Sequence, residues 1–434
     1  MAAFREHPLR HVLASEIRAR PYVRVQAPAR VAHIAALTDE GGDRAEREHV
    51  AALCAACGVA PPSDGADHFL VDLGGVVLKW ERHTEFGTYT FYAEGTFDAP
   101  FDGPVSTLVP QDWLAAIPGQ VLSATRMAFE PADAPERSLE DLAALFPGDT
   151  FTGSRMLDGR ATVWTDYRIH ADGHGRILIR DGGLNPRGAG RLIQRLTEVE
   201  TYRMMAMLAF PVARETRPLV AAAEEWLSRM VTGLADGGGG VEEERSLLRL
   251  LSRLAAEAEE LTARTSYRFG ASRAYYALVR KRVEELREER IVGLQPSGEF
   301  LYRRLIPAMD TCESVAARQG DLARRIAQAS DLLRTRVDVA LEEQNRDLLE
   351  SMDRRAQLQL RLQETVEGLS VVAISYYLVG LVVYLAKGLK AAGLPVDPAI
   401  AAGVAIPVVL GLVWLGVRRL RRAVTGGHEK GKKG

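Results

Sequence analysis

Residues 369–386 read LSVVAISYYLVGLVVYLA, eighteen residues in a row without a charge. A second apolar run follows a short loop, at residues 400–417 (IAAGVAIPVVLGLVWLGV). As helices, both are long enough to cross the hydrocarbon core of a bilayer, which takes roughly 17–25 residues. Two such runs in succession, flanked by Lys and Arg, predict a transmembrane hairpin rather than helices buried in a soluble core. The lipid bilayer is therefore the first predicted partner.

Basic residues around the two runs predict the orientation of the hairpin. The connecting loop, residues 387–399, carries only Lys387 and Lys390. The flanks on the other side carry Arg354, Arg355, Arg361, Arg418, Arg419, Arg421, Arg422, Lys430, Lys432 and Lys433. Because positive residues stay on the cytoplasmic side, we expect the long N-terminal part and the basic tail, residues 418–434, in the cytoplasm.

Composition limits the remaining classes of protein. The chain has 434 residues, 47% of them hydrophobic, enough for a soluble core besides the two spans. A net charge of −2 gives no reason to expect nucleic acid as a partner. Arg residues interrupt the first thirty positions, so no signal peptide is predicted.

Three cysteines, Cys54, Cys57 and Cys312, are too few for a disulfide framework and fit a reducing compartment. Cys54 and Cys57 form a lone C-x-x-C in a helix-like stretch. They are either two small buried hydrophobes or a zinc or redox pair.

The N-terminal part, residues 1–187, mixes helix and strand patterns. Helical patterns occur at residues 7–19 and 43–57. Strand patterns occur at residues 31–37, 69–73, 76–86, 88–93, 120–129, 161–169 and 176–180, separated by Gly, Pro and Asp turns. Several strands joined by tight turns predict a cytoplasmic α+β domain with a largely antiparallel or mixed sheet.

One strand pattern, residues 78–86, carries a candidate site. Alternation places Lys79, Glu81, His83 and Glu85 on one face of a continuous strand. Two carboxylates that flank an imidazole can bind a divalent cation or transfer protons, which makes Glu81, His83 and Glu85 candidate metal ligands. The alternative is a solvated strand face whose charges compensate one another.

Residues 188–368 are predicted to be helical, with a long stalk helix before the membrane. Helices are expected at residues 242–264 and 272–289, and a third from about residue 313 into the first span. Its apolar stripe consists of Leu322, Ile326, Ala329, Leu333, Val337, Leu341, Leu348 and Met352. A stalk of about 55 residues is roughly 80 Å long. It should therefore pack against the preceding helices and, as a coiled coil, against copies of itself, where a polar residue such as Asn345 can fix the register.

Within the first run, Ser370, Tyr377 and Tyr384 recur every seven residues. They can share one face that lines a pore or contacts another helix. Alternatively the tyrosines anchor the helix at the membrane interface and the serine bonds back to its own backbone.

Five motifs together resemble a family of uncharacterised bacterial membrane-anchored proteins over nearly the whole chain. They are His7-Pro-Leu-Arg10, Trp80-Glu-Arg-His-Thr-Glu-Phe86, the stretch from Gly190 to Arg203, Arg334-Thr-Arg-Val-Asp338 and the stretch from Glu364 to Tyr377. The resemblance implies a multi-pass protein of the bacterial inner membrane. It brings no activity and no catalytic residues.

The predicted architecture also resembles that of CorA-type magnesium channels. In that family five identical subunits surround a pore lined by the first spans, and a Gly-Met-Asn signature near the outer end helps to select hydrated magnesium. The corresponding stretch here is Tyr384-Leu-Ala-Lys-Gly-Leu-Lys390, without the signature. Lysines at a pore mouth repel a divalent cation, so the resemblance implies at most a channel of altered selectivity.

No motif for an enzyme or a cofactor occurs in the sequence. The first hypothesis is therefore a non-enzymatic, membrane-anchored cytoplasmic protein that forms homo-oligomers through its stalk helix. The alternative is a CorA-like ion channel or transporter. An enzyme that uses Glu81, His83 and Glu85 is the third hypothesis.

Overall fold

A computed structural model describes residues 6–11, 13–14, 22–38, 42–101, 110–148, 150–235, 240–393, 395 and 397–425. The chain divides into two compact units. Unit 1 comprises Met1–Gly238 with Ser246–Asp331, and unit 2 comprises Gly239–Arg245 with Leu332–Gly434. The predicted boundaries between the α+β domain, the helical region, the hairpin and the basic tail, after residues 187, 368 and 417, stay predictions.

Unit 1 contains a mixed sheet, which confirms the predicted α+β class. In the described residues it has nine strands in the order β2-β3-β4-β1-β5-β8-β7-β6-β9. The strands are β1 (Ala29–Leu37), β2 (His68–Asp72), β3 (Val77–Arg82), β4 (Phe86–Glu94), β5 (Gln120–Glu130), β6 (Thr152–Met156), β7 (Ala161–Thr165), β8 (Gly175–Asp181) and β9 (Glu289–Arg290). The pair β5 and β8 is parallel, and the other strand pairs are antiparallel.

Three short helices cover one face of this sheet. They are α2 (Gly42–Cys57), α3 (Gln111–Ala115) and α4 (Leu139–Leu145). Because successive side chains of a strand point to opposite faces, Trp80, Tyr89 and Phe91 all face this layer, where they pack with Leu53 and Trp113.

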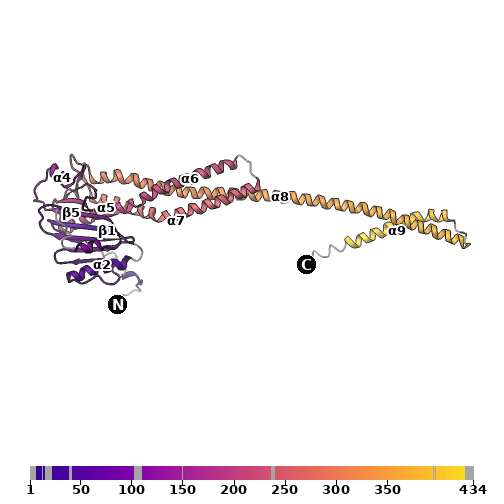
Figure 1. The fold of residues 1–434 in the computed structure, drawn as a ribbon, viewed down its shortest axis with the longest axis horizontal. Helices are drawn as coiled ribbons and strands as arrows, with labels where there is room; N and C mark the ends of the chain where they lie inside the picture. The colour runs from indigo at the N-terminus through magenta and orange to yellow at the C-terminus, as the bar shows by residue number, and fades with distance from the viewer. Residues whose placement is uncertain are drawn as a thin grey trace. The chain divides into compact units, whose positions relative to one another are not determined.

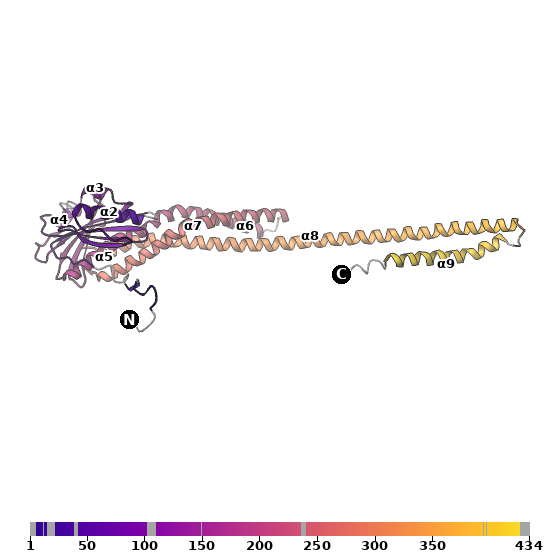
Figure 2. The same ribbon diagram turned by 90° about the horizontal axis from the view of Figure 1, so that it is seen from below.

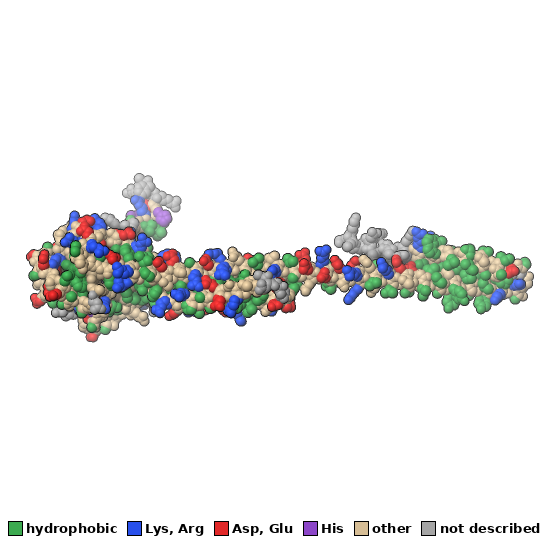
Figure 3. Space-filling model, turned by 90° about the horizontal axis from the view of Figure 1, so that it is seen from above, with side chains coloured by type: hydrophobic (Ala, Val, Ile, Leu, Met, Phe, Trp, Pro, Cys, Tyr) green, Lys and Arg blue, Asp and Glu red, His purple; other side chains and the backbone are tan. Residues whose placement is uncertain are grey.

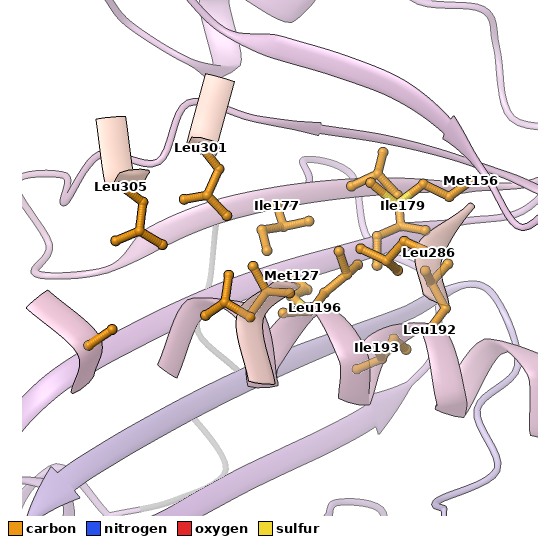
Figure 4. Close-up of a cluster of buried hydrophobic side chains, with 14 of the residues drawn as sticks. Met127, Met156, Ile177, Ile179, Leu192, Ile193, Leu196, Leu286, Leu301 and Leu305 are labelled. Carbon is orange, nitrogen blue, oxygen red and sulfur yellow. The ribbon is translucent and has the colours of Figure 1, made fainter. Parts of the chain in front are cut away.

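Helix α5 (Pro186–Met207) covers the opposite face of the sheet (Figure 2). The apolar stripe of α5 includes Leu192 and Leu196, which pack on Met127, Ile177 and Ile179 of the strands (Figure 4). Burying these side chains stabilises the folded chain by about 2 kcal/mol for each large aliphatic residue.

The helices that follow form the predicted long-helix bundle. They are α6 (Ala209–Ala235), α7 (Val241–Leu286) and α8 (Ser297–Ala391) (Figure 1). Within unit 1, Arg318 of α8 binds Glu224 of α6 at 3.2 Å, and Gln319 bonds Thr265 of α7 at 3.1 Å. The predicted break between residues 264 and 272 is wrong, because α7 continues through the exposed Gly270.

Unit 2 contains the remainder of α8 and helix α9 (Pro398–Thr425), which lies alongside the end of α8 in both ribbon views (Figures 1 and 2). The two apolar runs therefore form a pair of helices, as predicted. The apolar stripe of the stalk is buried only as far as Val337, and Leu348 and Met352 are 60% and 58% exposed.

The predicted continuous strand over residues 76–86 is wrong. Strand β3 ends at Arg82 and β4 begins at Phe86, and the backbone N–H of His83 donates to the Phe86 carbonyl at 2.8 Å. His83, Thr84 and Glu85 form the turn of a β-hairpin. The alternation that places His83 and Glu85 beside Glu81 therefore does not apply beyond Arg82.

Helix α5 approaches the chain at Val23 very closely. A Cβ atom added to Gly190 would lie 1.7 Å from the Val23 carbonyl oxygen. Nearby, the backbone N–H of Val25 donates to the Pro186 carbonyl at 3.1 Å. Glycine at position 190 is what allows this distance.

We expect Gly190→Ala to lower the free energy of unfolding by about 1–3 kcal/mol, since α5 and the backbone at Val23 must move apart. Chemical denaturation of the detergent-solubilised chain measures the change. Gly270→Ala is the matched control, because no atom lies within 4 Å of its added Cβ, and it should stabilise α7 by up to about 1 kcal/mol. Equal stability of the two variants would contradict this account of the contact.

Candidate functional site

The structure separates the three predicted metal ligands. Glu81 lies in β3 and forms an ion pair with Lys79 at 2.9 Å. Glu85, in the hairpin turn, receives hydrogen bonds of 2.6 and 3.3 Å from Arg268 of α7. The His83 ring stacks on Phe86 with 4.3 Å between centroids. Among the described residues, no group of three or more His, Cys, Asp or Glu side chains could hold a metal ion.

Two of these residues, Glu81 and His83, nevertheless line a polar cavity of about 230 Å³ between the sheet and the helices. We call it the sheet–helix cavity. Strands β1, β3 and β4, the hairpin turn, α5 and α7 all contribute to its wall. The lining residues are His33, Lys79, Glu81, His83, Phe86, Thr88, Thr90, Tyr92, Gln194, Thr197, Glu198, Thr201, Tyr202 and Arg282.

Strand register brings the polar residues of this wall together. Thr90 of β4 pairs with His33 of β1 on one side and with Lys79 of β3 on the other. Residues opposite one another in a sheet point to the same face, so the three side chains form a polar row under α5. The neighbouring positions Trp80 and Tyr89 point into the other, apolar layer.

The charged side chains of the cavity are paired with one another. Lys79 is 5% exposed and donates to Gln194 of α5 at 3.1 Å as well as binding Glu81. Gln194 donates to Glu198 at 2.8 Å, and Glu198 binds Arg282 of α7. A buried charge costs several kcal/mol unless it is paired and hydrogen-bonded. This chain of contacts therefore ties α5 and α7 to the sheet.

His33 lies at the buried end of the polar row. One ring nitrogen is 2.8 Å from the Thr90 hydroxyl and the other 2.9 Å from the Thr201 hydroxyl. Burial, helped by the charges of Lys79 and His83, lowers the pKa of His33 to about 3. A general base works best with a pKa near the operating pH, so His33 is poorly suited to catalysis at neutral pH.

The charged side chains of the cavity therefore have a structural role. Its cations and carboxylates already satisfy one another, and its volume lies below the roughly 300–1,000 Å³ of usual ligand sites. The sequence did not reveal this network, because Lys79, Gln194 and Arg282 meet only through strand register and helix packing. The one local signal of it in the sequence is the opposite charges three residues apart in the helical stretch 190–203, Arg195 with Glu198 and Glu200 with Arg203.

The two cysteines of the C-x-x-C pair differ in exposure. Cys54 is buried in the layer of α2, and Cys57 is partly exposed. Burial raises the pKa of Cys54, so its thiol is not activated as a nucleophile.

In α8 the predicted face of Ser370, Tyr377 and Tyr384 is exposed within the single chain, and the two tyrosines are 76% and 75% exposed. The hydroxyl of Ser370 donates to the Val366 carbonyl at 2.9 Å. The buried side chains of the helix pair include Ser375 and Ala386 of α8 instead. Whether the exposed face lines a pore stays a prediction.

Residues 5–424 match the family described as "Protein of unknown function (DUF3422)", so the chain belongs to that family. No curated protein matches the chain. A solved structure titled "structure of the full-length CmaX protein" is similar at 14% identity, over 69% of this chain and 89% of that one. The TM-score is 0.15, so this similarity supports no argument about fold or function.

The pKa of His33 predicts a pH-dependent stability. In the unfolded chain this histidine regains a pKa near 6.5 and binds a proton that the folded chain excludes until about pH 3. The stabilisation that the neutral His33 provides is complete above about pH 6.5 and decreases as the pH falls, because the unfolded chain then binds a proton that the folded chain does not. We expect the free energy of unfolding to fall by about 2 kcal/mol between pH 7 and pH 5 through His33 alone.

Denaturation of the full-length protein at several pH values measures this slope. His33→Gln should reduce the slope between pH 7 and pH 5, whereas His68→Gln, outside the sheet–helix cavity, should keep that of the wild type. The same slope in the wild type and in His33→Gln would show that His33 is not the titrating group.

Proposed function

We propose that this chain is a non-enzymatic, multi-pass anchor protein of the bacterial inner membrane. The apolar segments of α8 and α9 cross the bilayer and hold unit 1 on the cytoplasmic side. The protein self-associates through the stalk part of α8. Membership of a family without a known function is compatible with this role.

The observation that carries the proposal is the exposure of apolar side chains in unit 2. Only 11% of the most apolar 18-residue stretch of α8 and 6% of that of α9 are buried. A core helix of a soluble protein is mostly buried. Leu369, Leu381 and Ile400 are 74%, 70% and 69% exposed. Figure 3 shows these apolar surfaces gathered over the two helices. Removing them from water requires lipid or other helices.

Charge supports the proposed orientation. Lys387 and Lys390 are the basic residues of the outer loop, and Arg418 and Arg419 follow the second span. Arg418 lies over the Trp414 ring at 4.9 Å, a pairing typical of the membrane interface. Lys430, Lys432 and Lys433 lie outside the described residues.

Labelling of single cysteines in spheroplasts tests this topology. A membrane-impermeant maleimide should label Lys390→Cys in intact spheroplasts, because that residue lies in the last turn of α8, in the proposed outer loop. Arg229→Cys, exposed in α6, should react only after permeabilisation. The wild-type chain gives the background of the native cysteines. Labelling of Arg229→Cys in intact spheroplasts would refute the cytoplasmic location.

The stalk part of α8 supports self-association. Leu341, Asn345, Leu348 and Met352 follow one another at intervals of four, three and four residues, which is coiled-coil spacing. Leu348 is 60% exposed in the single chain. A polar Asn among such residues is best satisfied by the same Asn of a second copy, so the proposed partner is another chain of this protein.

The mass of the detergent-solubilised particle tests this proposal, and we expect a multiple of the 47.5 kDa chain. Leu348→Glu should reduce the particle to monomers, because it places a charge in the seam. Leu360→Glu is the matched control, since Leu360 is 62% exposed but lies outside the seam. A monomeric wild type, or equal dissociation of both variants, would contradict self-association through this seam.

The CorA-like channel is the second candidate. It is favoured by the continuity of α8 over 95 residues from Ser297 to Ala391, which includes both a bundle helix and the first span. It is disfavoured by Lys387 and Lys390 at the outer end. A wild-type particle of five chains favours the channel, and a dimer favours the anchor.

A further inference from the structure

A groove of about 640 Å³ lies in unit 1, apart from the sheet–helix cavity. Its walls are the turn between β6 and β7, the first turns of α5 and the C-terminal end of α7. Five basic side chains line it, Arg160, Arg191, Arg195, Lys281 and Arg287, against the two carboxylates of Glu284 and Glu285. We call it the basic groove.

Two contacts fix the β6–β7 turn to the end of α7, which are two of the walls of the basic groove. The backbone N–H of Leu157 in the β6–β7 turn donates to the Leu286 carbonyl at the end of α7 at 2.8 Å. Across the same junction Arg287 forms an ion pair with Asp158 at 3.0 Å. The groove is thus largely pre-formed, as ligand sites usually are.

Some basic side chains of the groove are paired with a carboxylate and others are not. Arg195 binds Glu285 at 3.1 Å, a carboxylate that Arg282 also binds at 3.0 Å. The side chains of Arg160, Arg191 and Lys281 form no ion pair or hydrogen bond with any other residue that the structure describes. These three cations come from three different elements. The whole chain has 55 basic and 57 acidic residues, so such a local excess is not a general property of its surface.

The first turn of α5 adds to the positive potential. Asn185 caps this 22-residue helix by accepting a hydrogen bond from the Gly188 N–H at 2.8 Å. Gly188 also lines the groove, but it is buried against the Asn185 and Leu184 side chains, so α5 contributes through its dipole and not through the Gly188 N–H. The N-terminus of a helix carries a partial positive charge and favours anions.

From these observations we infer that the basic groove binds a small phosphorylated molecule with at least two negative phosphate oxygens. Two guanidinium groups match phosphate oxygens in bidentate geometry, and Lys281 adds a point charge. Leu157 and Leu184 provide an apolar wall for the organic part of the molecule. The volume of the groove lies within the roughly 300–1,000 Å³ of usual ligand sites.

Calorimetric titration of the full-length protein in a neutral detergent tests the inference, with inorganic pyrophosphate and ADP as probes. We expect saturable binding of one molecule per chain that weakens as salt is raised. Arg191→Gln and Lys281→Gln should each weaken binding at least fivefold. Both side chains are exposed, so the fold should be retained, which the melting temperature checks.

The matched controls are Arg214→Gln and Arg229→Gln, exposed arginines of α6 outside the groove. They should bind both probes like the wild type. Equal loss in the control variants, or no saturable binding of either probe to the wild type at millimolar concentration, would overturn the inference.

The same phosphate chemistry also occurs in lipid headgroups, and a competition arm distinguishes the two sources. Pyrophosphate binding is measured with the protein in nanodiscs of zwitterionic lipid, with and without phosphatidic acid. Weaker pyrophosphate binding to the wild type in the nanodiscs that contain phosphatidic acid supports the groove as a headgroup site. Unchanged pyrophosphate binding supports a soluble ligand.

Discussion

Burial of the Lys79 ammonium beneath α5 constrains how α5 and α7 pack on the sheet of unit 1. A charge that is 5% exposed needs counter-charges and hydrogen bonds, and these come from Glu81 in the same strand and Gln194 in the covering helix. Gln194 in turn orients Glu198, which binds Arg282 of α7. The position of α5 over the sheet is therefore set by polar contacts as well as by the apolar stripe of Leu192 and Leu196.

The elements that the sequence predicted are those with a strong local pattern. The two apolar runs are recognised by their length and lack of charge, and the N-terminal strands and the stalk helix by periodicity within a single segment. All of these elements are present in the structure. The hairpin turn at His83 was missed because residues 82–86 contain no Gly, Pro or Asn, although the alternation of charged and apolar residues stops at Arg82. Strand β6 was missed as well, since Thr152–Met156 contains Gly, Ser and Arg where strands usually have branched apolar residues.

The sites could be predicted far less well than the elements. Arg160, Arg191 and Lys281 lie up to 121 positions apart in the sequence, and no spacing rule connects them. They meet because the β6–β7 turn, the start of α5 and the end of α7 converge at one corner of unit 1. The candidate ligands Glu81, His83 and Glu85 show the opposite case, in which neighbours in sequence are drawn to different partners by a turn.

The two-residue strand β9 has a consequence for how chains of this protein can meet. It pairs with β6 and is the last strand at that edge of the sheet. Its two residues, Glu289 and Arg290, are both exposed and charged. Unpaired sheet edges invite the strands of other molecules, and short, charged edge strands discourage such pairing. Growth of the sheet into intermolecular β-structure is thus disfavoured at this edge, even where many copies of the chain lie close together.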